Sequence, residues 1–187
     1  CNTFHAPLIW NVFESGVKEC AAEHKEVSVT LINMVDATVE YILRTSHKTH
    51  NGIEKIGLLS TEGTKETKLY HDKFKAHGVE VICVPEAMQI ALTQALYDPT
   101  WGIKAQSSPV TNLAIETMHN CAEWLAQVGK VEGIILGCTE IPLALPATSS
   151  FGNWSIPLVD PVEVLASTFV DHAKRRSMKD RVRIHSS

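Results

Sequence analysis

The ten residues GIILGCTEIP, at positions 133–142, place a short apolar run directly before small polar residues. The run does not alternate between apolar and polar residues, which is typical of a strand buried on both faces of a parallel sheet. Four further runs have the same character, namely residues 27–33 (VSVTLIN), 55–60 (KIGLLS), 79–84 (VEVICV) and 156–160 (IPLVD). Helical patterns separate them, at residues 4–22, 37–46, 64–77, 110–128 and 162–174. This alternation predicts an α/β fold with a parallel sheet and right-handed crossovers.

The segments between these elements predict two long loops and a solvated tail. Pro, Gly and Ser residues mark loops at residues 99–109 and 146–155, and loops of this length often line a site. The residues from Lys174 onward include six Lys or Arg and few apolar residues. We expect a helix end there, followed by a solvated terminus.

Composition limits the classes of protein to consider. With 187 residues, 44% hydrophobic, the chain can bury a substantial core. Its net charge of −4 argues against nucleic acid as a partner. No run reaches the roughly 18–20 apolar residues of a membrane helix, so no membrane partner is expected. His47 and His50 have helical spacing, but no third ligand accompanies them, so no metal is expected.

The five cysteines are scattered and odd in number: Cys1, Cys20, Cys83, Cys121 and Cys138. Such a set argues against a disulfide framework, and the absence of CxxC argues against a structural zinc site or a thioredoxin-like redox pair. Free thiols predict a reducing compartment, most simply the cytoplasm. Cys20, Cys83 and Cys121 fall within predicted elements, and we expect them to be core residues.

Three segments place small polar residues where a ligand could bind, at the start of a predicted helix. Cys138 follows a strand, and the positive end of a helix dipole would favour its thiolate; the alternative is a cysteine that ends a buried strand. Thr61 and Thr64 could cradle a carboxylate, or could simply cap a helix. The third segment is the start of the chain, Cys1 to His5, which lacks a preceding strand.

Taken in order, these motifs resemble those of the aspartate/glutamate racemase family. The matching stretches are CNTFH at residues 1–5, VDAT at 35–38, GLLSTEGT at 57–64 followed by Tyr70, GCTE at 137–140 and PLVD at 157–160. The resemblance covers nearly the whole chain. It implies two pseudo-symmetric, three-layer flavodoxin-like domains, the first incomplete. Residues 1–35, rejoined by 161–187, would belong to the first domain, and residues 36–160 would form the second.

The resemblance also implies roles for individual residues. Cys1 and Cys138 match the two catalytic thiols, which exchange a proton with opposite faces of the substrate Cα. Five residues match positions that hold the substrate's α-carboxylate and amino group: Asn2, Thr3, Thr61, Thr64 and Thr139. Lys104 matches a lysine that meets the side-chain carboxylate in aspartate racemases, with a solvated loop lysine as the alternative. Glu140, where glutamate racemases carry His, favours the aspartate or broad-specificity branch.

The resulting expectation is a cytoplasmic, cofactor-independent racemase that interconverts L- and D-aspartate or a related amino acid. Family members often pair, which leaves a homodimer open. Because the family's first half would precede Cys1, we expect an N-terminally truncated chain that is inactive or nearly so alone. Two alternatives are a non-catalytic carboxylate-binding fragment and an amidase using Cys1 as an N-terminal nucleophile. Within the family, the alternatives are a glutamate or broad-specificity racemase, a hydantoin racemase, a maleate isomerase and a decarboxylase. His5 could tune Cys1 or lie on a helix surface.

Overall fold

The computed structural model describes residues 5–24, 29–46 and 52–185, with side chains up to residue 175. Its centre is a five-stranded sheet in the order β2-β1-β3-β5-β4. The strands are β1 (Lys55–Leu59), β2 (Glu80–Cys83), β3 (Ile134–Leu136), β4 (Thr148–Phe151) and β5 (Ile156–Val159). The first four in the spatial order are parallel, and only β4 pairs antiparallel, with β5. The predicted α/β class with a mainly parallel sheet is therefore confirmed.

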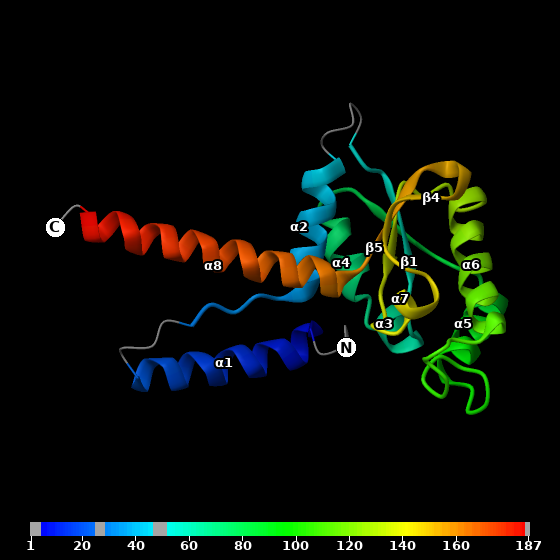
Figure 1. Cartoon of the computed structure of the whole chain (residues 1–187), viewed down its shortest axis with the longest axis horizontal. Helices are drawn as coiled ribbons and strands as arrows, with labels where there is room; N and C mark the ends of the chain where they lie inside the picture. Colours follow the sequence, from blue (N-terminus) through cyan, green and yellow to red (C-terminus); the bar gives the residue numbers. More distant parts are fainter. Residues whose placement is uncertain (1–4, 25–28, 47–51, 186–187) are drawn as a thin grey trace.

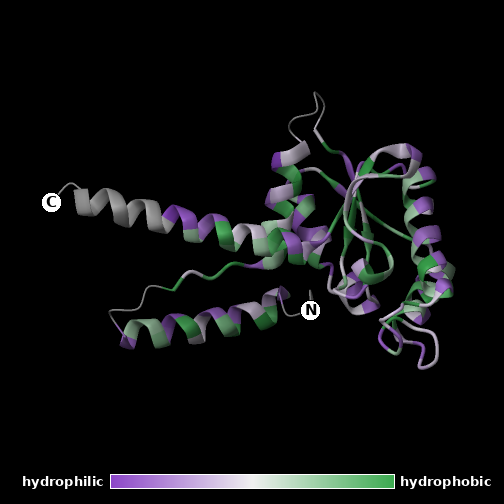
Figure 2. Ribbon diagram, viewed as in Figure 1, coloured by the Kyte–Doolittle hydropathy of each residue, from purple (hydrophilic) through white to green (hydrophobic). Residues whose placement is uncertain are grey.

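Helices cover both faces of the sheet (Figure 1). One face packs against α5 (Glu86–Tyr97), α6 (Asn112–Gln127) and α7 (Ile141–Ala144), through residues such as Leu92, Leu125 and Leu136. The other packs against α2 (Met34–Ser46), α4 (Leu69–Lys75) and the start of α8 (Pro161–His185). Hydrophobic residues concentrate on the strands between these layers (Figure 2). This accounts for the continuous apolar strands, which face helices on both sides.

The first helix differs from the others in how little it packs. In α1 (Pro7–Glu23) no residue is buried, and Leu8 is 82% exposed. The segment just before α1 does make contact with the body, because Ala6 is buried in the core cluster that includes α2. The predicted domain boundaries at residues 35/36 and 160/161 stay predictions.

Two predicted elements are wrong in the region before β1 and at the C-terminal end. Residues 29–33 form no strand; Val29 is 49% exposed, and no described strand lies beside it to complete a hydrogen-bonded ladder. The helix predicted over residues 162–174 does not end there, because α8 continues through Lys174 to His185. Residues 162–185 contain no Gly and no Pro, so nothing in the chain stops the helix.

The predicted helix over residues 64–77 is two helices. The first, α3 (Glu62–Glu66), ends at Thr67, whose hydroxyl donates to the backbone oxygens of Gly63 and Thr64. Lys68 then adopts a left-handed conformation with φ 51° before α4 begins. The predicted loop at residues 146–155 also contains β4 and a short 3₁₀ helix, η2 (Gly152–Trp154).

Candidate functional site

Two neighbouring parallel strands, β1 and β3, place two polar segments at one edge of the sheet. β1 and β3 are neighbours in register, with Leu59 opposite Leu136, and the Gly137 N–H donates to the Leu59 oxygen at 2.6 Å. The two strands therefore end side by side. The residues that follow β1, Ser60 and Thr61, lie next to those that follow β3, Gly137 and Cys138. The carboxyl edge of a parallel sheet is where open α/β proteins bind ligands.

Gly137 fixes how closely Cys138 follows the neighbouring strand. A Cβ at this position would lie 2.8 Å from Leu58 Cδ1, 3.0 Å from the Leu59 oxygen and 3.1 Å from Ser60 Cβ. No side chain fits there without a shift of the neighbours. The missing side chain at Gly137 therefore lets this segment lie close against strand β1.

Cys138 is buried, and it donates a hydrogen bond to the same Glu140 carboxylate oxygen as the adjacent Thr139. Its Sγ donates to Glu140 Oε2 at 2.9 Å, and the Thr139 hydroxyl donates to the same oxygen at 2.8 Å. Burial, followed by the hydrogen bond to Glu140, raises the pKa of the Cys138 thiol to about 11. Burial alone would raise the pKa of Glu140, but the hydrogen bonds from Cys138 and Thr139 and the charge of Lys104 outweigh it and lower that pKa.

The prediction that a helix dipole favours the Cys138 thiolate is therefore wrong. Cys138 lies three residues before α7, which has only four residues, Ile141–Ala144. The dipole's influence is confined to the first turn of a helix, and here the burial and the adjacent carboxylate favour the protonated thiol.

Lys104 comes from a different part of the chain and meets the same carboxylate. Its Nζ lies 3.4 Å from Glu140 Oε1 and 4.4 Å from the centre of the Tyr97 ring. The loop that carries Lys104 is folded back on α5, where the Ile103 N–H donates to the Ala95 oxygen. Lys104 is thus joined to the Cys138 segment by an ion pair, although its side chain is 42% exposed, as the alternative of a solvated loop lysine implies.

A glycine and an aspartate hold that loop in place. The Asp98 carboxylate accepts hydrogen bonds from the hydroxyl and N–H of Thr100 and from the N–H of Trp101, which lower its pKa. Gly102 packs on the same turn, where a Cβ would lie 2.6 Å from the Asp98 backbone nitrogen and oxygen. The position of Lys104 therefore depends on a turn that only glycine at 102 allows.

Thr61 and Thr64 form the N-terminus of α3. The Thr61 hydroxyl accepts from the Thr64 N–H at 3.4 Å, and the two hydroxyl oxygens lie 3.2 Å apart. The capping alternative is thus realised, and Thr64 is buried while Thr61 is partly exposed. Gln89, a residue that the sequence did not single out, donates its side-chain N–H to the Ser60 oxygen at 3.0 Å and is itself buried. It ties the Thr61 segment to α5.

Three predicted site residues lie outside the described residues: Cys1, Asn2 and Thr3. His47 and His50 also lie outside them. The first described residue, His5, accepts a hydrogen bond at Nδ1 from the Met34 N–H at 3.3 Å and stacks on Trp10. His5 therefore helps to satisfy the start of α2, as Asn33 does by accepting from the Val35 N–H.

The remaining cysteines divide by burial. Cys121 is buried, as predicted, and Cys83 is partly buried with its Sγ 3.7 Å from His71 Nε2. Cys20 is exposed, so the prediction of a core position is wrong: α1 has no neighbouring element that buries it. These three cysteines and Cys138 are free thiols.

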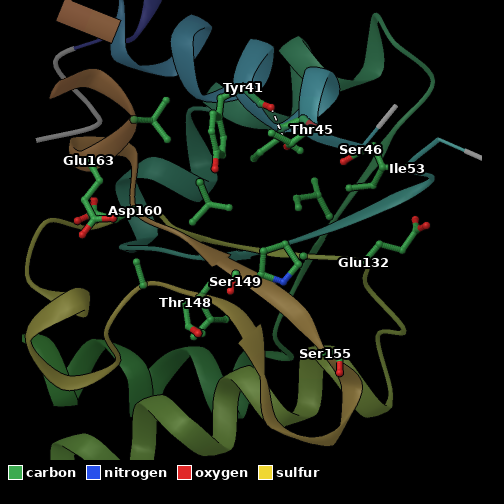
Figure 3. A pocket seen from close by; sticks show the side chains of 18 of the residues that line it. Tyr41, Thr45, Ser46, Ile53, Glu132, Thr148, Ser149, Ser155, Asp160 and Glu163 are labelled. Atoms are coloured by element: carbon green, nitrogen blue, oxygen red, sulfur yellow. Dashed lines mark hydrogen bonds between the residues drawn. The ribbon is translucent and has the colours of Figure 1, made fainter. Parts of the chain in front are cut away.

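A large cavity lies elsewhere on the molecule. It measures about 860 Å³ and is bordered by α2, the β4 and β5 strands and the start of α8. Figure 3 shows Tyr41, Asp160 and Glu163 around it. None of the predicted site residues lines it. Within the described ranges, no three His, Cys, Asp or Glu side chains gather in a way that could hold a metal ion. Nor does that part of the chain contain a helix long and apolar enough to cross a membrane.

Comparison with known proteins gives consistent matches. The chain is 26% identical over 183 residues to glutamate racemase 3 of Caldanaerobacter subterraneus, covering 95% of this chain and 55% of the relative. A putative Asp/Glu racemase from Yersinia pestis has a similar structure, with a TM-score of 0.59 and 26% identity over 78% of this chain and 56% of that one. Picrophilus torridus aspartate racemase, at 22% identity, shares the fold, with a TM-score of 0.58 over 82% of this chain and 58% of that one.

The chain thus spans little more than half the length of these relatives. The sequence model of the Asp/Glu/hydantoin racemase family matches residues 13–169, which is most of the chain and includes the Thr61, Lys104 and Cys138 segments. The chain therefore belongs to the Asp/Glu/hydantoin racemase family.

Proposed function

We propose that these residues belong to a cofactor-independent amino-acid racemase that acts on aspartate or a related acidic amino acid, with Cys138 as one of its two acid/base groups. The observation that carries the proposal is the cluster at the sheet edge. There a buried thiol is linked through Glu140 to the ammonium of Lys104, with Sγ–Oε2 and Nζ–Oε1 distances of 2.9 Å and 3.4 Å.

The thiol suits the proton-transfer step. Racemisation removes a proton from one face of Cα and returns a proton to the other face, so two opposed groups can complete it without turning the substrate. Cys138 would serve one face; the resemblance in sequence assigns the other to Cys1. General acid–base catalysis of this kind contributes about 10²–10⁴-fold per group.

The polar groups around Cys138 would stabilise the carbanion and bind the carboxylates of the substrate. Negative charge builds on the α-carboxylate as Cα loses its proton, and donors aimed at that carboxylate lower the barrier. The exposed Thr139 and partly exposed Thr61 would contribute there, with Asn2, Thr3 and Thr64 assigned by resemblance. Lys104, whose side chain is 42% exposed, would receive the distal carboxylate of an acidic substrate.

The test is isotope incorporation by the gene product that contains these residues. With L-aspartate in D₂O, the wild type should form D-aspartate carrying deuterium at Cα, detected by chiral chromatography and mass spectrometry. Cys138→Ser should reduce inversion by about 10²-fold or more. Inverted product without deuterium, or a wild type that exchanges no Cα hydrogen, would overturn the proposal.

Two parallel measurements separate the alternatives. L-Glutamate under the same conditions distinguishes an aspartate enzyme from a glutamate or broad-specificity one. Aspartate that binds in calorimetry without exchange at Cα would instead indicate a non-catalytic carboxylate-binding protein.

A further inference from the structure

Glu140 holds side chains on both of its carboxylate oxygens. Oε2 accepts from the Cys138 thiol at 2.9 Å and from the Thr139 hydroxyl at 2.8 Å, and Oε1 lies 3.4 Å from Lys104 Nζ. Lys104 in turn lies over the Tyr97 ring. In the part of the chain that the structure describes, the charged groups that act on the Cys138 thiol are Glu140 and Lys104.

The short sulfur–carboxylate distance is informative about the proton. An ionised carboxylate only accepts hydrogen bonds, so a neighbour at 2.9 Å must donate. A thiolate at that distance would set two negative charges side by side in a partly buried site, where repulsion is weakly screened. Glu140 is kept ionised, because hydrogen bonds and the charge of Lys104 hold its pKa below the ordinary value despite burial.

A racemase with two thiols needs one of them protonated and the other deprotonated before each turnover. Two equivalent thiols would share that proton without preference. A carboxylate beside one of the two thiols makes them different, because it favours the protonated form of that thiol.

Building on the proposed function, we infer that Glu140 is a positioning residue that keeps Cys138 protonated in the resting enzyme, so that Cys138 is the proton donor of the first turnover. In that turnover the opposing base takes the Cα proton and the Cys138 S–H bond breaks. The new C–H bond forms on the opposite face, and Cys138 is left as the thiolate. The resting enzyme is then ready for the enantiomer whose Cα hydrogen points away from Cys138.

The two charged neighbours should act in opposite directions. Glu140 raises the pKa of the Cys138 thiol, whereas Lys104 lowers it. Removing the carboxylate should make the thiol more acidic, and removing the ammonium should make it less so. A purely structural role for either side chain would not produce this pair of opposite signs.

The test is the pH dependence of alkylation at each cysteine of the gene product. The protein is treated with iodoacetamide from neutral to alkaline pH, and the peptides are quantified by mass spectrometry. In Glu140→Gln the midpoint for Cys138 should move to lower pH. Because the thiolate is the reactive form, alkylation at neutral pH should become about tenfold faster if that midpoint falls by about one pH unit. In Lys104→Met, alkylation of Cys138 at the same pH should be slower.

Cys121 provides the internal control. Its pKa is also raised to about 11, but by burial alone. Its profile should not change in either variant, and loss of the fold would accelerate both cysteines together. If Glu140→Gln unfolds, Lys104→Met, which alters an exposed side chain, still decides the question. An unchanged or slower Cys138 in Glu140→Gln beside a constant Cys121, or an unchanged or faster Cys138 in Lys104→Met, would overturn the inference.

This outcome is separable from the fate of the proposed function. If alkylation of Cys138 is faster in one variant and slower in the other, but the protein exchanges no Cα hydrogen, the role of Glu140 is supported and the racemase proposal is overturned. If the enzyme inverts its substrate normally but the pH profile of Cys138 alkylation is unchanged in both variants, the racemase proposal is supported and the role of Glu140 is overturned.

Discussion

Gly137→Ala offers a direct test of how the site is attached to the sheet. The added methyl would meet Leu58 Cδ1 at 2.8 Å and the Leu59 oxygen at 3.0 Å. The leucine side chain can rotate, but the backbone oxygen cannot move without disturbing the β1–β3 pairing. Overpacking of this kind costs about 1–3 kcal/mol. For a domain of this size, each kcal/mol corresponds to a fall in Tm of about 2–4 °C.

The matched control is Gly63→Ala, in the neighbouring Thr61 segment. An added methyl there meets nothing within 4 Å, and the residue lies in α3. Alanine is favoured over glycine in a helix by about 0.5–1 kcal/mol, so this variant should melt at or slightly above the wild type. Thermal unfolding followed by circular dichroism measures both. The argument fails if Gly137→Ala melts no lower than Gly63→Ala.

Three further predictions concern groups that the structure places around the site. Gln89→Leu leaves the Ser60 oxygen without its side-chain donor, so the free energy of unfolding in urea should fall by about 1–3 kcal/mol; no fall would contradict the contact. Gly102→Ala should displace the turn that carries Lys104 and, on the proposed function, raise KM for aspartate; an unchanged KM would contradict a role of this turn in substrate binding. In the native protein Cys20 should react with a thiol reagent well before the buried Cys121, and equal rates would contradict the described burial.

The strands that the sequence predicts well are the ones buried on both faces. Residues 56–59 and 133–137 consist of apolar residues and glycine, because helices pack on each side of β1 and β3. β4 shows no such pattern, since Thr148, Ser149 and Ser150 are exposed and only Phe151 is buried. Its strand character comes from pairing with β5, which no local pattern reveals.

The break between α3 and α4 depends on the local conformation of two residues, which the pattern of apolar residues does not reveal. Leu69, Tyr70 and Phe74 have helical spacing within residues 64–77. The Thr67 hydroxyl, however, bonds back to the preceding turn, and Lys68 takes a left-handed conformation. Both residues are compatible with a continuous helix by propensity alone.

Within the site, the sequence motifs predicted that the Thr61 and Cys138 segments lie together at the sheet edge, but not the electrostatics there. The position of Cys138 after a strand is visible in the sequence, whereas its burial and the orientation of Glu140 toward its sulfur are not. The ion pair between Lys104 and Glu140 likewise depends on a loop folded against α5. These tertiary contacts reverse the direction of the thiol pKa that local helix position implied.

The antiparallel edge strand β4 has a consequence for the behaviour of the protein in solution. An open sheet edge offers unpaired backbone groups to any other extended chain, which is a route to aggregation. β4 has four residues, its outward positions are hydroxyl side chains, and its register with β5 shifts between Thr148 and Phe151. Such a short, irregular and polar margin is a poor template for strand addition. The β4 edge of the sheet is therefore protected against pairing with strands of other molecules.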